Sequence, residues 1–380
     1  MNNYIPISDV VWFQEGPGVR NTQYTNDGVK LLNVANLVNG EVDISNTNRY
    51  ISEEEAYGKY KHFLADEGDL IIASSGIKVD YFDKKMGFVK KEHLPLCMNT
   101  STIRFKSLDS DIFSIKYFMH FLKSESFKQQ LATQITGSAQ LNFGPSHLKK
   151  MYVKVVSIEE QHLIANKLDK VNSLILARKQ QLEKLDQLVK SRFVEMFGEV
   201  ENLIHRWDVK RFADVTINLD STRKPVKDAD RQKMQGEYPY YGATGIVDYV
   251  NDYRIDGTFL LISEDGKALE FRNKDIAFIA SGKIWVNNHA HILQCTEDIQ
   301  MIFLKCYMNF RNISDWVTGI DQKKLNRANL DKIPIGLPPI GLQKEFSAFV
   351  EQVDKSKATV QQSLEKLETL KKALMQEYFG

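Results

Sequence analysis

Two stretches of this chain place apolar residues at alternating steps of three and four, the pattern of a helix that packs one face against a partner helix. The first stretch begins near Ile158, and the second runs to the last residues of the sequence. We expect two helices of about 40 residues, each roughly 60 Å long. The apolar positions include Ile164, Leu168, Val171, Ile175, Leu182, Leu185, Val189 and Met196 in the first, and Phe346, Val350, Val353, Val360, Leu364, Leu367, Leu374 and Tyr378 in the second.

The two stretches are copies of one another. Residues 330–380 align without a gap on residues 148–198. An internal match of this kind indicates a duplicated architecture. The clearest matches are a glutamine near the start of each helix and a Phe-Gly pair at its end, Gln161 with Gln343 and Phe197-Gly198 with Phe379-Gly380.

Basic residues interrupt the apolar pattern of the two copies at different positions. Arg178 and Arg192 stand in the first copy, whereas Lys357 and Lys371 stand in the second. Long basic side chains can cover a partner's apolar surface with their methylenes while the charge stays in water. We therefore expect the two helices to pack on each other. The predicted packing residues are Leu168, Val171, Leu182, Leu185, Val350, Val353, Leu364 and Leu367.

A globular segment precedes each long helix. The first contains short β-rich runs, such as residues 30–34 and 69–73, and one predicted helix over Ile112–Ile135. The predicted fold is mixed α/β, with two globular domains separated by two long antiparallel coiled-coil-like helices in a pseudo-two-fold arrangement. The expected segments are a first domain at 1–150, a helical region at 151–199, a second domain at 200–332 and a second helical region at 333–380.

The composition is that of an ordinary globular protein, with 43% hydrophobic and 26% charged residues. Its 50 basic and 49 acidic side chains give a net charge of +1, which does not by itself favour a nucleic-acid partner. The cysteines Cys97, Cys295 and Cys306 form no C-x-x-C pair, so reduced thiols are expected. The sequence contains no secretion signal and no apolar run of about 20 residues, and we expect a cytoplasmic protein without membrane contact.

Motifs of stand-alone enzymes are missing. The sequence contains no G-x-x-x-x-G-K-[ST] loop, and residues 242–245 are interpreted as a turn between strands. Residues 337–340, Leu-Pro-Pro-Ile, lack the Asp or Asn of an amino-methyltransferase motif, and the prolines are expected to end a strand and start a helix. His289 and His291 with Cys295 could form a metal site, but strand alternation would bring both imidazoles to one face beside a single thiol. We assign no catalytic residue and no metal ligand.

Polar, basic and aromatic side chains in turn-rich sequence are the candidates for binding. Arg, Lys, Asn and Gln suit base edges, and Lys and Arg suit phosphates, although any one of them could equally be an ordinary surface residue. In the first domain the candidates are Arg20, Asn21, Lys78, Asn99, Gln140 and Asn142. In the second they are Arg223, Lys224, Tyr240, Tyr241, Lys267, Lys283, Trp285, Asn287, Asn288, His289, His291, Gln322, Lys323, Lys324 and Asn326.

Together these features resemble the specificity subunit of type I restriction-modification systems, the HsdS family. The resemblance covers the full chain and is carried by residues 240–250 (YYGATGIVDYV), 260–266 (LLISEDG), 285–291 (WVNNHAH) and 333–343. The first domain departs most, because it lacks the Tyr-Tyr-Gly and Trp-Val-Asn-Asn runs. The two domains are therefore expected to recognise different DNA sequences.

The resemblance implies a non-catalytic subunit that binds a bipartite asymmetric site in double-stranded DNA, one half per domain, with the helices setting the gap. It also implies docking of two methyltransferase subunits, which bring S-adenosylmethionine for adenine N6 methylation, and of restriction subunits, which bring ATP and Mg²⁺. No cofactor is then bound by this chain itself. Two alternatives stay open: a coiled-coil interaction or anti-restriction scaffold that reads no DNA, and a stand-alone DNA-modifying enzyme, which the missing motifs argue against.

Overall fold

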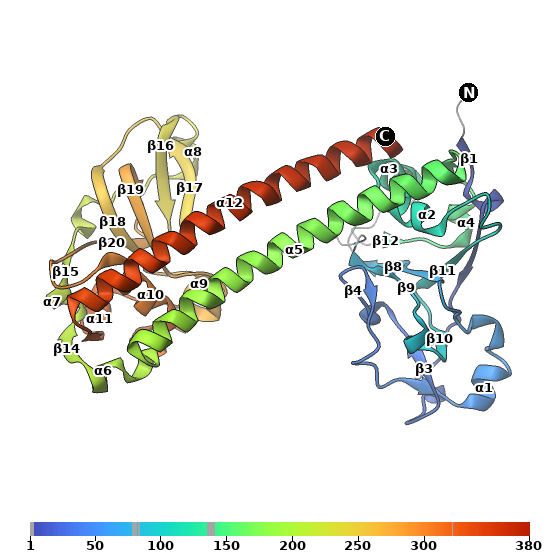
Figure 1. The fold of residues 1–380 in the computed structure, drawn as a ribbon, viewed down its shortest axis with the longest axis horizontal. Coiled ribbons are helices and arrows are strands. Elements are labelled where there is room, and N and C mark those ends of the chain that lie inside the picture. The colour runs from blue at the N-terminus through green and yellow to red at the C-terminus, as the bar shows by residue number, and fades with distance from the viewer. Residues whose placement is uncertain (1–3, 78–81, 83, 135–140, 321) are drawn as a thin grey trace. The chain divides into compact units, whose positions relative to one another are not determined.

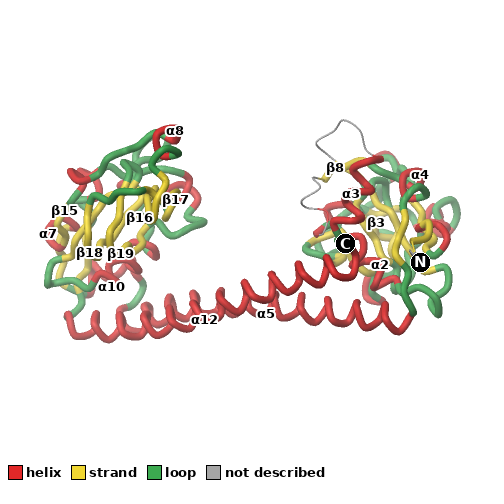
Figure 2. Tube along the Cα trace, turned by 90° about the horizontal axis from the view of Figure 1, so that it is seen from above, coloured by secondary structure: helices red, strands yellow, loops and turns green. Residues whose placement is uncertain are grey.

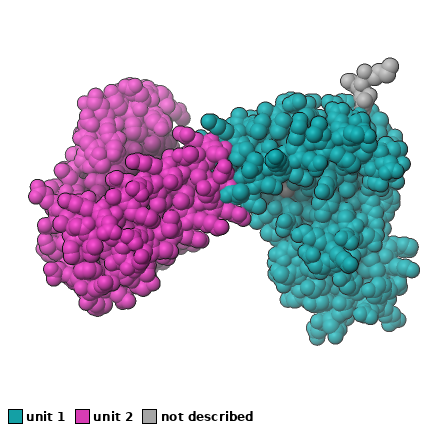
Figure 3. Space-filling model, in the orientation of Figure 1, with its two compact units in different colours: residues 1–177, 364–380 teal, residues 178–363 magenta. Residues whose placement is uncertain are grey.

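The computed structural model describes residues 4–77, 82, 84–134, 141–320 and 322–380. The chain divides into two compact units, residues 1–177 with 364–380 (unit 1) and residues 178–363 (unit 2), drawn in separate colours in Figure 3. The candidates Lys78 and Gln140 lie outside the described residues. Two long helices, α5 (Ile158–Phe197) and α12 (Ile340–Phe379), are green and red in Figure 1, and each contributes one part to each unit.

Unit 1 is built from short strands and short helices before α5. Its strands are β1 (Tyr4–Pro6), β2 (Val11–Glu15), β3 (Val29–Leu32), β4 (Leu37–Val38), β5 (Glu41–Val42), β6 (Tyr50–Ile51), β7 (Leu70–Ala73), β8 (Ser75–Ile77), β9 (Met86–Phe88), β10 (Leu96–Met98), β11 (Thr102–Ser107), β12 (Leu141–Asn142) and β13 (Tyr152–Lys154). Its helices are α1 (Glu53–Tyr57), α2 (Ile115–Leu122), α3 (Glu125–Gln134) and α4 (Pro145–Leu148).

Unit 2 has longer strands. They are β14 (Asp208–Arg211), β15 (Thr216–Asn218), β16 (Gln235–Gly242), β17 (Gly245–Val250), β18 (Ile255–Ser263), β19 (Ala277–Val286), β20 (Ala290–Cys295) and β21 (Pro334–Leu337). Its helices are α6 (Leu203–Arg206), α7 (Phe212–Val215), α8 (Asp228–Arg231), α9 (Lys267–Phe271), α10 (Met301–Phe310) and α11 (Arg327–Leu330). The predicted turn between strands at 242–245 is confirmed, and so is the strand that ends before the Pro-Pro pair.

Both units contain the same four-stranded antiparallel sheet. The order is β2-β11-β7-β9 in unit 1 and β15-β20-β18-β19 in unit 2. In unit 2 the sheet continues through β16, which runs parallel to β19, to the edge strand β17, as Figure 2 shows. The duplication seen in the helices therefore extends to the sheets.

One apolar helix packs against each shared sheet. In unit 1 the ring of Phe118 on α2 lies 5.3 Å from Phe105 on β11, and both side chains are buried. The single predicted helix over Ile112–Ile135 is wrong, because it divides into α2 and α3. The hydroxyl of Ser124 donates to the carbonyl of Phe121 and accepts from the amide of Phe127, which ends one helix and starts the next.

The Phe-Gly pair that closes each long helix completes the core of a unit. Phe379, 1% exposed, belongs to unit 1, where its ring lies 5.1 Å from that of Tyr117 on α2. Phe197 is fully buried in unit 2, where its ring lies 5.1 Å from Phe303 on α10 and 5.4 Å from Phe346. The last turn of each long helix is thus part of a hydrophobic core.

The long helices run antiparallel within each unit. In unit 2 Asp186 pairs with Lys357 at 2.5 Å and Arg192 pairs with Glu345 at 2.9 Å, so the residue number rises along one helix as it falls along the other. The predicted mixed α/β fold, with two globular domains and two long antiparallel helices, is confirmed. Of the predicted packing residues, Leu168, Val171, Val350, Val353 and Leu364 are buried, and Leu182, Leu185 and Leu367 are half-buried.

A buried glutamine ties the start of each long helix to its globular part. Gln161 accepts from the amide of Ser114 at 2.8 Å, and Gln343 accepts from the amide of Gln300 at 2.9 Å. Ser114 and Gln300 are the N-cap residues of α2 and α10. Each glutamine also donates 2.8 Å to a carbonyl five residues earlier in the chain, and both are fully buried. None of the described helices combines the length and the apolar character that crossing a membrane requires.

Candidate nucleic-acid interface

Three loops meet at one end of the shared sheet in unit 2. They are the turn Glu264–Gly266 after β18, the segment Asn287–His289 before β20 and the pair Lys324-Leu325 before α11. The amide of Glu264 donates to the carbonyl of His289 at 2.9 Å, and the amide of Leu325 donates to the carbonyl of Glu264 at 2.8 Å. We call this arrangement the three-loop cluster.

Unit 1 has the same three-loop cluster, formed by Ser74–Gly76, Asn99–Ser101 and Asn142-Phe143. The amide of Ser74 donates to the carbonyl of Ser101 at 2.9 Å, and the amide of Phe143 donates to the carbonyl of Ser74 at 3.0 Å. These are the same two bonds that join the loops of unit 2.

The strand registers fix which positions are equivalent. Ala73 pairs with Thr102 in unit 1 as Ser263 pairs with Ala290 in unit 2. Likewise, Ser75 pairs with Asn142 as Asp265 pairs with Lys324. The equivalent pairs of positions are therefore 74 and 264, 75 and 265, 101 and 289, and 142 and 324.

A buried asparagine and a glycine recur at equivalent places in both clusters. Asn99 and Asn287 are 2% and 8% exposed. Their side-chain oxygens accept, each at 2.8 Å, from the amides of Thr100 and His289 respectively, which shapes the loop. Gly76 and Gly266 have φ of 73° and 100°, a backbone conformation that favours glycine. The candidates Asn99 and Asn287 thus have their side-chain oxygens engaged by backbone.

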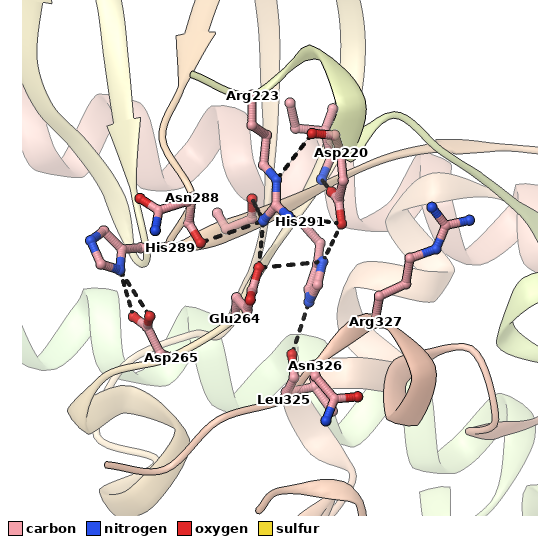
Figure 4. A network of polar contacts seen from close by, with 12 residues as sticks. Asp220, Arg223, Glu264, Asp265, Asn288, His289, His291, Leu325, Asn326 and Arg327 are labelled. Carbon is pink, nitrogen blue, oxygen red and sulfur yellow. Dashed lines mark hydrogen bonds and ion pairs between the residues drawn. The ribbon is translucent and has the colours of Figure 1, made fainter. Parts of the chain in front are cut away.

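A network of charged side chains, most of them buried, fills the cluster of unit 2, as Figure 4 shows. Arg223 reaches Glu264 at 2.5 Å and Asp220 at 3.3 Å. Lys324 reaches the other oxygen of Glu264 at 2.9 Å. His291, 1% exposed, has its Nδ1 2.6 Å from Asp220 and its Nε2 2.8 Å from the carbonyl of Leu325. The two ring nitrogens of His291 thus join η8 (Asp220–Thr222) to the segment before α11.

The network lowers the pKa of its carboxyl groups. Burial acts to raise the pKa of Asp220, but the hydrogen bond and charge of His291 and the amide of Ile292 outweigh it and hold the pKa below the ordinary 3.8. Burial also acts to raise the pKa of Glu264, and hydrogen bonds from Arg223 and Lys324 outweigh it, so this pKa lies below the ordinary 4.5. Both carboxylates are therefore ionised at neutral pH.

His289 lies at the exposed edge of the same cluster. Its Nδ1 is 2.9 Å from both carboxylate oxygens of Asp265, whose side chain is 11% exposed, whereas the His289 side chain is 46% exposed. The predicted placement of both imidazoles on one strand face is wrong, because His289 precedes β20 and only His291 lies within it. Among the described residues, no group of three or more His, Cys, Asp or Glu side chains could hold a metal ion.

The other exposed candidates lie at several places on the units. Lys283 lies over the rings of Tyr253, at 4.9 Å, and Tyr238, at 5.9 Å. Asn326 is half-buried and caps α11 by accepting from the amide of Asn329 at 2.9 Å. Half-buried Lys323 lies beside the three-loop cluster, and the exposed candidates are Arg20, Asn21, Asn142, Lys224, Lys267, Asn288 and Gln322.

Three aromatic candidates are buried. Tyr240 and Trp285 are 1% and 3% exposed and share one apolar cluster, while Tyr241, 9% exposed, belongs to another. The Tyr240 hydroxyl accepts from the amide of Val226 at 3.0 Å, and the Trp285 indole donates to the carbonyl of Lys224 at 2.7 Å. In the described structure these side chains stabilise the sheet of unit 2.

Sequence reasoning missed the acidic and hydroxyl members of the two clusters. They are Asp220, Glu264 and Asp265 in unit 2 and Ser74, Ser75 and Ser101 in unit 1. The search for binding residues favoured side chains that contact DNA directly. A signal was present for two of them, since Glu264 and Asp265 belong to the LLISEDG run that carries the family resemblance.

Comparison with known families identifies the class of protein. The type I restriction modification DNA specificity domain matches residues 4–187 and again residues 205–369. The chain therefore belongs to this family, the specificity subunits of type I restriction-modification systems, and has two target-recognition domains. The resemblance seen in the sequence is confirmed.

Individual relatives match parts of the chain. The specificity subunit S.HindORF215P of Haemophilus influenzae is 38% identical over 142 residues, which are 37% of this chain and 36% of that protein. The MjaVIII specificity subunit of Methanocaldococcus jannaschii is 23% identical over 190 residues, 49% of this chain and 43% of the relative. The EcoKI specificity subunit of Escherichia coli is 24% identical over 209 residues, 53% of this chain and 43% of the relative. The matches span less than half the length of these curated relatives.

Solved structures share the fold over nearly the full chain. The crystal structure of the type I restriction-modification S subunit from M. genitalium has a TM-score of 0.62 at 17% identity and covers 99% of this chain and 96% of its own. A chain from a structure on complex assembly and conformational transition of the type I R-M system has a TM-score of 0.55 at 13% identity, covering 99% and 97%. At these identities the likeness concerns the fold alone.

Proposed function

We propose that this chain reads a bipartite, asymmetric site in double-stranded DNA, one half per globular unit. The observation that carries the proposal is the three-loop cluster, which has the same backbone bonds in both units but different exposed side chains. A repeated scaffold with different polar groups suits two unlike half-sites, because base edges differ in their donors and acceptors.

The near-neutral charge of the chain is compatible with this function. Neither half-contact has to be strong alone, because a covalent link between two binding units makes the second contact effectively intramolecular. Phosphate contacts would then come from exposed cations on each unit, such as Arg20 in unit 1 and Lys267 in unit 2. Binding would weaken as salt rises.

The long helices would set the gap between the half-sites and dock the catalytic partners. Each helix has 40 residues, which corresponds to roughly 60 Å. Exposed leucines on α5 support a docking role, since Leu163 and Leu176 are 54% and 58% exposed. The partners we propose are two methyltransferase subunits and restriction subunits.

The chemistry would belong to those partners. S-adenosylmethionine would come with the methyltransferase subunits, and ATP and Mg²⁺ with the restriction subunits. This chain would contribute recognition and assembly. The target adenine has to leave the duplex for N6 methylation, so the recognition subunit must hold the flanking DNA in register with the methyltransferase.

Methylome sequencing tests the proposal. We expect cells that carry this chain with a methyltransferase subunit of its own system to acquire N6-methyladenine at one motif. That motif should consist of two different half-site sequences separated by a fixed number of base pairs. A methylome with no such motif contradicts DNA reading by this chain. If the purified complex also retains every duplex equally in a gel-shift assay, the interaction-scaffold alternative is favoured.

The role of the helices has its own test. Removal of one heptad from a long helix should shift the preferred gap or abolish methylation, because it shortens the link between the two units. If the methylome keeps the original gap between the half-sites, the helices do not set that gap, even when both half-site sequences are still recognised.

A further inference from the structure

Three equivalent positions of the three-loop clusters carry different side chains in the two units. Unit 1 has Ser75, Ser101 and Asn142, where unit 2 has Asp265, His289 and Lys324. The backbone bonds that place these positions are the same in both units. The side chains have therefore changed on a constant framework.

The same cross-loop contact is made in each unit by different chemistry. In unit 1 the hydroxyl of Ser75 donates to that of Ser101 at 2.6 Å. In unit 2 the Nδ1 of His289 lies 2.9 Å from both oxygens of Asp265, as Figure 4 shows. In both cases one side chain holds the other in a fixed orientation at the edge of the cluster.

The contact with Asp265 determines what His289 presents outward. Nδ1 donates to the carboxylate oxygens of Asp265, which leaves Nε2 as the ring nitrogen that can meet DNA. Nε2 forms no hydrogen bond with a described residue. In the major groove a ring nitrogen can pair with a base edge, as an acceptor toward an amino group or as a donor toward an oxygen or N7.

We infer that positions 75, 101 and 142 in unit 1 and positions 265, 289 and 324 in unit 2 determine the DNA sequence read by each unit, with His289 reading one base and Asp265 positioning it. This inference rests on the proposed function. It commits to these residues because each set combines one side-chain contact between loops with a third position that pairs with it in register, on the same backbone bonds in both units.

Selection from a randomised DNA library tests the inference. The chain, co-purified with its methyltransferase subunit, is incubated with fully randomised duplexes, and the retained duplexes are sequenced. We expect His289→Ala to lower the preference at one base pair of one half-site by about 5- to 150-fold. The other half-site should be unchanged. The matched control is His205→Ala, because His205 is exposed in unit 2 on α6, outside the cluster.

Two further variants sharpen the test. His289→Gln offers both a donor and an acceptor, so it should change the preferred base at the same base pair rather than remove the preference. Ser101→Ala should relax one base pair in the opposite half-site, because position 101 is the equivalent of 289 in unit 1.

The outcomes separate this inference from the proposed function. If the unaltered chain enriches no two-part motif, the proposed function fails. The unaltered chain could instead enrich a motif whose preference at every base pair stays the same in His289→Ala and His289→Gln. In that case the inference fails, while the proposed function stands. A loss spread evenly over all base pairs, or loss of folding in both variants, also overturns it, since either result assigns His289 a structural or phosphate role.

Discussion

The three-loop clusters of the two units use the same backbone bonds but stabilise their interiors differently. In unit 2 the cluster encloses charges, with Glu264 held by Arg223 and Lys324. In unit 1 the equivalent of Glu264 is Ser74, which is 1% exposed and whose hydroxyl has no hydrogen-bond partner among the described residues. The geometry of the loops is therefore fixed by the main chain, and the side chains are free to differ.

On the neighbouring strand it is unit 1 that buries charges and unit 2 that is apolar. In unit 1 Arg104 on β11 is 5% exposed and lies 3.3 Å from Asp69, whereas the equivalent residue of unit 2 is Ile292, 1% exposed in an apolar cluster. The registers place Arg104 opposite Ile71 and Ile292 opposite Leu261. One sheet can thus bury an ion pair or an apolar cluster at the same place.

The largest expected effect tests whether each closing phenylalanine stabilises one unit. Phe379→Ala should lower the opening free energy of unit 1 by about 3–5 kcal/mol, and Phe197→Ala that of unit 2 by a similar amount, because each leaves a cavity in a core. Hydrogen exchange measured by mass spectrometry reports the two units separately. Phe271→Ala is the control, since Phe271 is 60% exposed. Equal loosening of both units by either variant would contradict this assignment.

The second effect compares equivalent residues of the two clusters. Glu264→Ala should destabilise unit 2 by about 3 kcal/mol, because it leaves Arg223 without its closest partner. Ser74→Ala should be neutral or slightly stabilising in unit 1, because it removes an unpaired buried hydroxyl. Urea unfolding combined with hydrogen exchange measures both. The exposed Glu270→Ala is the control for unit 2, and a large loss from Ser74→Ala would break the comparison.

The third effect is the stability lost when the buried glutamine of a long helix is removed, and it should be the same in both units. Gln161→Ala and Gln343→Ala should each cost about 1–3 kcal/mol, since each leaves a buried N-cap amide and a carbonyl unpaired. Protection of α2 and of α10 against hydrogen exchange is the measurement. Gln180→Ala, at an exposed position of α5, should change neither helix. An effect in one unit but not the other would show that the two glutamines are not equivalent.

The smallest effect concerns pH and should differ between the units. Burial lowers the pKa of His120 against the opposing hydrogen bond of Asp169, and burial also lowers the pKa of His93, both from 6.5. Below pH 6.5 the unfolded chain therefore binds protons that the folded unit 1 does not. Its stability should fall as the pH falls, by at most about 1.4 kcal/mol per pH unit for each histidine.

Unit 2 provides the contrast for the same measurement. The lowered pKa values of Asp220 and Glu264 stabilise the folded unit at pH values above the ordinary 3.8 and 4.5. This stability is lost as the pH falls through the still lower pKa values of the folded state. Hydrogen exchange at pH 7.5 and 5.5, corrected for the intrinsic rates, should show weaker protection at the lower pH in unit 1. His120→Gln should reduce that difference, and an unchanged difference would assign it to other groups.

Local and repeated features of this protein could be predicted from the sequence. The heptad pattern predicts α5 and α12, and the match of Gln161 with Gln343 marks two residues that make equivalent bonds. The helix over Ile112–Ile135 is wrong because the apolar spacing continues across Ser124, whose hydroxyl bonds interrupt the helix. Periodicity reports which face is apolar, but it does not report where a short polar side chain competes for backbone groups.

The sequence by itself determines the duplication, the two long helices and the family, because apolar periodicity and internal repeats are local signals. Only the tertiary structure decides that Ser101 corresponds to His289. The sequence analysis did not match these two residues, and their equivalence comes from backbone bonds between loops that lie far apart along the chain. Side chains at such loops carry no periodic signal, since neither core packing nor helix geometry constrains them.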